Sequence, residues 1–291
     1  MPSILVTGGS GQLGYEIQKF FKSDSNSALN KEYELIAPSR DELDFSNSDS
    51  VENYFSTNSP DIIIHSGALT NVDRCETEPD LALRHNGESV NYLLNAATNN
   101  NAAFKHFIYI STDFVFPGNR SIPYTEVDEV GPVNMYGQSK LRGEENLLAN
   151  TAAKDMGTVL RTSWVYGGPD SAFIKWVKEN GDSEDFTVNE DCVSVPTSSA
   201  TIAKVVFQVI EKELFGVYHL VNNGSCTRRE MAAFILDKEL DEVPSNKIVQ
   251  NRVAKRPSYS VLNCEKVESD LDTKIPIWQE SLGEHLKEYY D

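Results

Sequence analysis

The sequence lacks three features that mark common functional classes: paired cysteines, a surplus of basic residues and a long apolar run. Its 291 residues include only four cysteines, which are scattered and show neither a C-x-x-C motif nor a zinc-like spacing. Isolated thiols of this kind are typical of a reducing compartment. No apolar run approaches the roughly 20 residues of a membrane-spanning helix, and the first residues lack the basic and apolar regions of a signal peptide. We therefore expect a cytoplasmic protein without a membrane partner.

Basic residues are few relative to acidic ones. Lys and Arg number 26 and Asp and Glu number 44, which gives a formal net charge of −18. Nucleic-acid binding needs a basic face, so we expect no nucleic-acid partner. If the substrate is anionic, its cleft must locally reverse the sign of the protein. The few arginines outside the acidic stretches are then candidates for binding it.

Short apolar runs alternate with segments of helical spacing up to about residue 165. These runs are apolar on both faces, which predicts a parallel sheet covered by helices on both sides, an α/β fold. The predicted strands are Ser3–Thr7, Tyr33–Ala37, Asp61–His65, His106–Ser111 and Thr158–Thr162. The predicted helices are Tyr15–Lys22, Val51–Thr57, Ala82–Asn99 and Asn134–Asn150, and Ser23–Lys31 is predicted to be a loop.

A glycine-rich segment lies between the first predicted strand and the helix after it. Gly8, Gly11 and Gly14 are spaced three apart there. Such glycines permit a tight turn and close approach of the backbone to a pyrophosphate, which sits at the helix N-terminus. We expect Gly8 and Gly11, with Gln12 and Leu13, to bind a dinucleotide. The alternative is a glycine-rich turn in an unrelated fold.

The residues after the second predicted strand bear on the choice between NAD and NADP. NAD sites usually place an acidic residue there, but this chain has Ser39 and Arg40, which suit a 2′-phosphate. Asp44 and Phe45 are expected to contact the adenine. The segment favours NADPH, with NADH as the alternative because acidic residues follow Arg40 and because Arg40 could be a solvated loop residue. Residues 1–165 are thus predicted to form a Rossmann-type, doubly wound NADP-binding domain.

The pattern after residue 165 is less regular and predicts a smaller α/β lobe, residues 166–291, that binds the substrate over the strand ends. The boundary is soft, and segments of the two parts can interleave. The expected elements are helices at Phe173–Asn180, Ser199–Lys212 and Arg229–Leu240, a strand at Val217–Val221 and a loop-rich stretch over 242–291.

Three residues form the predicted catalytic set: Thr112, Tyr136 and Lys140. Tyr136 and Lys140 are four apart and would share one face of a helix. A nearby ammonium favours phenolate, so we expect Lys140 to lower the pKa of Tyr136. Thr112, preferred to Ser111, follows a strand and could hydrogen-bond a substrate carbonyl while Tyr136 delivers a proton. The predicted reaction is hydride transfer to a ketone; the alternative for the Ser-Thr pair is a loop cap.

Together these motifs resemble the extended short-chain dehydrogenase/reductase family and, within it, the dTDP-4-dehydrorhamnose reductases. The similarity runs nearly end to end and rests on Gly11-Gln-Leu-Gly14, Thr70-Asn-Val-Asp73, Ser111-Thr-Asp-Phe-Val-Phe-Pro-Gly118, Tyr136-Gly-Gln-Ser-Lys140 and Arg161-Thr-Ser-Trp-Val-Tyr166. The resemblance implies NADPH-dependent reduction of the 4-keto group of dTDP-4-dehydrorhamnose to dTDP-L-rhamnose.

The resemblance also implies roles for further residues. It makes Thr112, Tyr136 and Lys140 the catalytic triad. The wall of the cofactor site maps onto Ser66, Gly67 and Ala68, and the sugar contacts map onto Thr70, Val72, Asp113, Phe114 and Trp164, with Arg256 as a partner of the pyrophosphate. The chain departs from the family pattern at Ser66–Ala68, at Phe114 and at Cys192. These departures leave the substrate less certain than the reaction.

Several alternatives stay open at this point. One is a reductase of another nucleotide-linked 4-keto sugar, such as a UDP-linked one. Another is a non-catalytic NADP-binding subunit that resembles the regulatory β-subunit of methionine adenosyltransferase. A 4,6-dehydratase is disfavoured because Phe114 stands where those enzymes have an acid, and a GDP-fucose type epimerase-reductase because no Cys–His pair is well placed.

Metal binding and oligomeric state are left open by the sequence. Some family members dimerise through Mg²⁺, and Glu16 matches one acidic position involved. We interpret Glu16 as a solvated helix residue and assign no metal ligand, so Mg²⁺ stays without support from the sequence. A homodimer is an alternative that the sequence does not decide.

Overall fold

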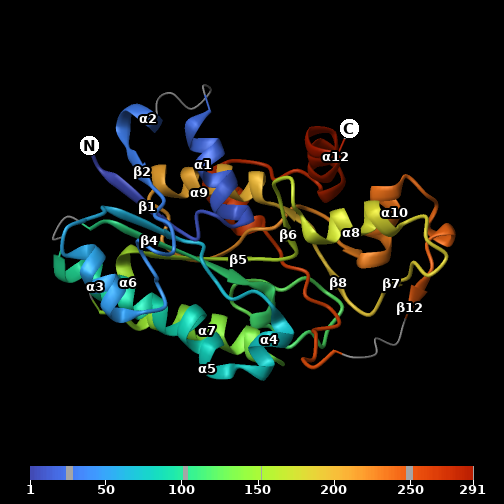
Figure 1. Ribbon diagram of the computed structural model, residues 1–291, viewed down its shortest axis with the longest axis horizontal. Helices are drawn as coiled ribbons and strands as arrows, with labels where there is room; N and C mark the ends of the chain where they lie inside the picture. Colours follow the sequence, from blue (N-terminus) through green and yellow to red (C-terminus); the bar gives the residue numbers. More distant parts are fainter. Residues whose placement is uncertain (24–28, 101–103, 152, 247–251, 291) are drawn as a thin grey trace.

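The computed structural model describes residues 1–23, 29–100, 104–151, 153–246 and 252–290 (Figure 1). Its centre is a six-stranded sheet in the order β10-β5-β4-β3-β1-β2, and all neighbouring strands are parallel. The strands are β1 (Ser3–Thr7), β2 (Glu34–Ile36), β3 (Ile62–His65), β4 (His106–Thr112), β5 (Gly157–Thr162) and β10 (Gly216–His219). The strand order reverses between β1 and β3, so the predicted doubly wound α/β fold is confirmed. Ligands of such sheets bind beyond the carboxyl ends of the strands at this reversal.

Helices cover both faces of the sheet, as alternate strand residues require. Ile4 and Val6 of β1 point into one apolar core, and Leu5 points into the other. The first core is covered by α1 (Gln12–Lys22) and α9 (Ser199–Glu211), which pack against each other. The second is covered by α3 (Ser48–Phe55), α6 (Ser89–Asn100) and α7 (Met135–Ala149), on the opposite side in Figure 1.

The chain between β3 and α6 is built from short helical pieces. They are α4 (Val72–Thr77), α5 (Pro79–Ala82) and a π-helical stretch, η2 (Leu83–Glu88), that runs directly into α6. The predicted helix Ala82–Asn99 is helical throughout, but Leu83–Glu88 within it have π-helical hydrogen bonding. Within η2, an added Cβ at Gly87 would lie 2.9 Å from the Arg142 side chain of α7, which shows how closely the two segments pack.

Of the remaining helices and short strands, α2 lies between α1 and β2, and the others follow β4 or β5. They are α2 (Leu29–Glu32), η3 (Asp113–Val115), η4 (Lys154–Met156), β6 (Val165–Tyr166), α8 (Ala172–Asn180), β7 (Val188–Asn189), β8 (Val193–Ser194), β9 (Thr197–Ser198), β11 (Cys226–Thr227), α10 (Arg228–Leu236), η5 (Leu240–Glu242), β12 (Ser245–Asn246), α11 (Glu265–Leu271) and α12 (Trp278–Tyr289). In Figure 1, α8, α10, β7 and β12 lie together beyond one end of the main sheet.

Three expectations are corrected here. The predicted strand Val217–Val221 belongs to the main sheet, because β10 pairs in register with β5. Residues 242–291 are loop-rich only in part: 252–264 contain no helix, but α11 and α12 follow, with buried faces that include Leu271 and Leu282. The predicted loop Ser23–Lys31 contains the start of α2, and its residues 24–28 lie outside the described residues. The division of function at residue 165 stays a prediction, although the chain returns to the first sheet after it.

The described part of the chain contains no helix that combines the length and the apolar character needed to cross a membrane. The four cysteines are free, as predicted, and three of them are buried.

Candidate active site

The glycine loop forms a cradle at the carboxyl end of β1. Gly8 has a positive φ of 70°, a conformation that favours glycine, and its carbonyl accepts the Gly11 N–H at 2.9 Å. A Cβ added at Gly14 would collide with the Gly8 carbonyl, and one added at Gly8 would lie 2.6 Å from the Cα of Gly67. Helix α1 begins at Gln12 with no side-chain cap on its first N–H groups. This geometry leaves backbone donors for a phosphate and fits a dinucleotide.

A cavity of about 580 Å³ extends from this loop to the start of α7. It is lined by most of the predicted cofactor residues: Gly8, Gly11, Gln12, Leu13, Phe45, Ser66, Gly67, Ala68, Tyr136 and Lys140. The Phe45 ring explains why this chain has glycine at position 67, one of the positions that depart from the family pattern: a Cβ there would lie 2.5 Å from that ring. A larger residue at position 67 would therefore displace Phe45 from the cavity wall.

A second cavity of about 260 Å³ continues from the glycine loop towards the end of β2. Arg40 and Asp44, both expected to contact the cofactor, line it, and the two side chains are 3.7 Å apart. Ser39 is not among its lining residues, and its hydroxyl instead donates to the Glu42 carboxylate at 2.9 Å. The prediction that Ser39 contacts the cofactor therefore has no support from this arrangement.

Two residues of this second cavity were missed by the sequence reasoning. Arg74 of α4 and His85 of η2 both line it, opposite Arg40. Their contribution depends on the helical pieces after β3, which the sequence pattern had merged into loop and a single helix. The only available signal was that Arg74 is a basic residue in an acidic chain.

The predicted catalytic residues lie together. Thr112, Tyr136 and Lys140 all line the 580 Å³ cavity, and the Thr112 hydroxyl is a hydrogen-bond partner of Tyr136. Ser111 differs, because its hydroxyl donates to the buried Glu144 carboxylate, which also pairs with Arg161 at 2.7 Å. The structure thus gives the two neighbouring hydroxyls different partners, and only that of Thr112 faces Tyr136.

Burial sets the protonation of this group. Burial raises the pKa of Tyr136 well above its ordinary value, with the neighbouring Thr112 hydroxyl opposing it. The expectation that Lys140 lowers the Tyr136 pKa is therefore wrong for the unliganded site. Burial also lowers the pKa of Lys140 to about 7, against the opposing effects of Glu144 and Cys75. The Lys140 ammonium lies 4.0 Å from the centre of the Tyr109 ring, which is a cation–π distance.

The first turn of α7 fixes the position of Tyr136. Asn134 caps the helix by accepting the Gly137 N–H at 2.8 Å. Gly137 is packed so closely beneath the loop after β4 that an added Cβ would collide with the Phe114 carbonyl. These contacts hold Tyr136 against the Phe114 ring, with ring centres 5.8 Å apart.

A third cavity, of about 260 Å³, opens on the other side of Tyr136. All six residues predicted to contact the substrate line it: Thr70, Val72, Asp113, Phe114, Trp164 and Arg256. Four residues line both this cavity and the 580 Å³ cavity: Thr70, Thr112, Tyr136 and Trp164. The Tyr136 side chain therefore lies at the junction between the two spaces.

Trp164 adopts an unusual backbone conformation at this junction. Its φ is +38°, which is strained for a bulky residue and is typical of functional sites. The centre of the Trp164 ring lies 3.9 Å from the guanidinium carbon of Arg228, and the centre of the Phe173 ring lies 4.5 Å from the same carbon. The strained turn thus supplies an aromatic wall that orients an arginine of the third cavity.

The third cavity carries a cluster of cations that is unusual for so acidic a chain. Arg228 and Arg252 line it beside Arg256, and both were missed by the sequence reasoning. Cys192, where the chain departs from the family pattern, and its neighbour Asp191 also line this cavity. Arg252 pairs with Asp191 at 2.5 Å. The local reversal of sign that an anionic substrate would require is therefore present.

Asp113 lies at the base of this cavity and is buried. Its carboxylate accepts hydrogen bonds from Thr112 and Ser194, each at 3.0 Å, and from Ser260. Burial nevertheless raises the pKa of Asp113 to about 6. The carboxyl group can therefore change protonation close to neutral pH.

Glu16 corrects a second expectation. It is buried, not solvated: its carboxylate accepts the Gly168 N–H at 3.3 Å and the Tyr289 hydroxyl at 3.1 Å. Among the described residues, no group of three or more His, Cys, Asp or Glu side chains is arranged to hold a metal ion.

Comparisons with known proteins give consistent results. Residues 1–291 match the family model described as the RmlD substrate binding domain. The spore coat polysaccharide biosynthesis protein SpsK of Bacillus subtilis is 34% identical, with 99% of this chain and 98% of that protein covered. The dTDP-4-dehydrorhamnose reductase of Salmonella typhimurium is 32% identical over 99% and 98% of the two chains. The structure of the dTDP-4-dehydrorhamnose reductase of Bacillus anthracis in complex with NADP is 30% identical, covers 99% of both chains and has a TM-score of 0.86.

Proposed function

This chain belongs to the family of the RmlD substrate binding domain, and from this premise we propose that it is an NADPH-dependent reductase of dTDP-4-dehydrorhamnose. The product would be dTDP-L-rhamnose, and the location would be the cytoplasm. The observation that carries the proposal is the position of Tyr136 between two cavities. One cavity adjoins a glycine cradle and the other holds three arginines. A proton donor at their junction can serve a carbonyl that meets a dinucleotide.

NADPH, when bound along the glycine loop, supplies a hydride to the ketone carbon. The new C–H bond leaves negative charge on the sugar oxygen, and Tyr136 donates its proton there to give the alcohol. Tyr136 carries its proton at neutral pH, as a general acid requires, and such an acid contributes about 10²–10⁴-fold. Thr112 would hold the same oxygen by a hydrogen bond once its hydroxyl turns from Asp113, to which it donates in this structure, and Lys140 would hold the cofactor's ribose.

Two sets of cations support the proposed cofactor and substrate. Arg40 and Arg74 face the cavity at the end of β2, which favours a 2′-phosphate and hence NADPH. Arg228, Arg252 and Arg256 face the third cavity, which favours the diphosphate of a nucleotide sugar. The diphosphate is common to dTDP and UDP, so the choice of dTDP rests on the relatives, which include dTDP-4-dehydrorhamnose reductases.

The decisive test is NADPH oxidation with dTDP-4-keto-6-deoxy-L-sugar, made in situ by a dehydratase and an epimerase. We expect turnover with this sugar and little with its UDP counterpart. Binding of NADPH without turnover of either sugar would contradict the reductase and favour a regulatory subunit. Turnover of the UDP sugar alone would change the nucleotide but keep the chemistry.

The role of Tyr136 is tested with Tyr136→Phe. We expect a loss of turnover of at least 10²-fold with NADPH affinity near normal, since the ring stays and only the acidic proton is removed. Tyr92→Phe on α6, which lines none of these three cavities, is the matched control. A Tyr136→Phe variant with wild-type turnover would remove Tyr136 from the mechanism.

A further inference from the structure

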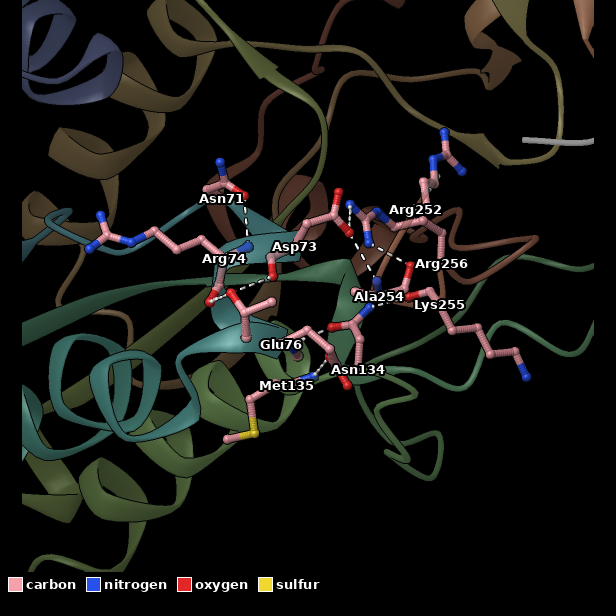
Figure 2. A network of polar contacts seen from close by, with 12 residues as sticks. Asn71, Asp73, Arg74, Glu76, Asn134, Met135, Arg252, Ala254, Lys255 and Arg256 are labelled. Carbon is pink, nitrogen blue, oxygen red and sulfur yellow. Dashed lines mark hydrogen bonds and ion pairs between the residues drawn. The ribbon is translucent and has the colours of Figure 1, made fainter. Parts of the chain in front are cut away.

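Three segments that are distant in sequence meet through polar contacts at the rim of the third cavity (Figure 2). They are helix α4, the start of helix α7 and residues 254–256. Each segment also supplies a residue to the cavity: Val72, Tyr136 and Arg256, respectively. The contacts among them therefore bear directly on the shape of the site.

Asp73 of α4 makes the contacts to residues 254–256. Its Oδ1 accepts the Ala254 N–H at 2.9 Å and lies 3.2 Å from Nη2 of Arg256. The other terminal nitrogen of Arg256 donates to the Ala254 carbonyl at 2.8 Å. The guanidinium is thus oriented on two sides, and the carboxylate provides one of them.

Glu76 and Asn134 connect the same region to the start of α7. The Glu76 carboxylate accepts the Met135 N–H at 2.8 Å, a favourable place for negative charge because it is the first turn of a helix. The Asn134 side-chain amide donates to the Lys255 carbonyl at 2.7 Å. The segment that carries Arg256 and the helix that carries Tyr136 are therefore tied to each other and to α4.

The segment after Arg256 is held from the other side by the loop after β4. Gly118 has a φ of +72°, and a Cβ added there would lie 2.6 Å from the Cα of Pro257. The Ser258 hydroxyl donates to the Gly118 carbonyl at 2.9 Å. These contacts fix where the segment lies. Among the ion pairs of the described residues, Asp73 is the only partner of the Arg256 guanidinium.

We propose that Asp73 is a positioning residue for diphosphate recognition, which seats residues 254–256 and aims Arg256 into the third cavity. This inference rests on the proposed function, because it assumes that the cavity binds a nucleotide diphosphate. Asp73 itself does not line the cavity, so it acts through Arg256.

Coulomb's law alone predicts the opposite effect of removing Asp73. A carboxylate beside the site repels an anionic ligand and competes with it for Arg256, so its loss should strengthen binding. If Asp73 positions Arg256, its loss should weaken binding instead. The sign of the change therefore decides between the two.

The test is calorimetric binding of dTDP to the full-length protein. We expect Asp73→Ala to weaken dTDP binding about tenfold, the size of one charge-assisted hydrogen bond, with NADPH affinity and melting temperature near wild type. Asp73→Asn keeps an acceptor for the Ala254 N–H and should fall in between; it decides the matter if the alanine variant fails to fold. Asp80→Ala on α5 removes an exposed acid nearby and is the control for charge.

Two further measurements separate positioning from a general effect. In an Arg256→Gln background, Asp73→Ala should change dTDP affinity little, because Asp73 acts through the side chain already removed. With the sugar substrate, Asp73→Ala should raise KM and leave kcat nearly unchanged. Two results would overturn the role of Asp73 while leaving the proposed function intact. One is unchanged or tighter dTDP binding in both Asp73 variants, and the other is a loss of affinity that adds to that of Arg256→Gln. A wild-type protein that binds neither dTDP nor UDP would overturn the proposed function and the role of Asp73 with it.

Discussion

Lys140 is expected to cost the folded protein stability while it serves the site. Burial lowers its pKa from 10.5 to about 7. At 1.36 kcal/mol for each pKa unit, a charged Lys140 destabilises the native state by about 5 kcal/mol at pH 6, where it is protonated in both folded and unfolded chains. Lys140→Met should therefore raise the free energy of unfolding in acid, although catalysis is lost.

The stability difference between Lys140→Met and wild type should depend on pH, which a change in packing alone would not produce. Above pH 7 the folded protein releases the Lys140 proton while the unfolded chain keeps it up to about pH 10.5, so wild-type stability rises with pH through this window. The advantage of Lys140→Met should thus shrink from about 5 kcal/mol at pH 6 to about 2 kcal/mol at pH 9. A loss of packing would give an offset that does not depend on pH.

Urea unfolding of the unliganded protein at several pH values measures both quantities. Lys105→Met is the control, because Lys105 is exposed just before β4 and should show no such trend. If Lys140→Met is less stable than wild type at pH 6, or if the difference is constant from pH 6 to pH 9, burial does not penalise the Lys140 charge.

Three other substitutions test the buried framework. Asp113→Asn should stabilise the protein by up to about 3 kcal/mol at pH 8, because burial raises the folded pKa of Asp113 to about 6 and so penalises its charge. At pH 3, where Asp113 is protonated in the folded chain, the substitution should have no such effect. Urea unfolding at several pH values measures this, and a gain that grows towards low pH would refute it. Glu144→Gln should destabilise the folded protein by about 3–5 kcal/mol, since it leaves Arg161 buried without its carboxylate partner. A loss below about 1 kcal/mol in thermal unfolding would show that the pair is well solvated. Gly137→Ala should destabilise by about 1–3 kcal/mol and lower kcat, because its Cβ meets the Phe114 carbonyl; unchanged kinetics would show that α7 tolerates the shift.

The regular part of the fold was predictable from the sequence because apolar runs and glycine spacing act locally. The ends of β1 and β4 match the predicted strands to within a residue. The C-terminal helices were missed because α11 and α12 are short or strongly acidic on their outer faces, and their buried residues are few. The short helices α4 and α5 were not predicted because six and four residues are too few to show a helical pattern, and the π-helical hydrogen bonding of η2 has no clear sequence pattern.

The candidate site was predictable where a motif carried it and not where several segments combine. Tyr136 and Lys140 share a helix face by spacing alone, and the structure brings both into one cavity. Arg228 and Arg252 reach the third cavity from elements far apart in the chain, which no local pattern reveals. The pKa of Tyr136 was misjudged for a related reason: the sequence shows the nearby lysine but not the burial that outweighs it.

The three arginines of the third cavity show how an acidic protein can offer an anion site. Arg252 and Arg256 are held by Asp191 and Asp73, so a bound diphosphate would have to share them with carboxylates. Arg228 takes part in none of the ion pairs among the described residues; aromatic rings hold it instead. Aromatic faces orient a guanidinium without neutralising it. The cavity therefore combines two arginines paired with carboxylates and one whose charge is left for the ligand.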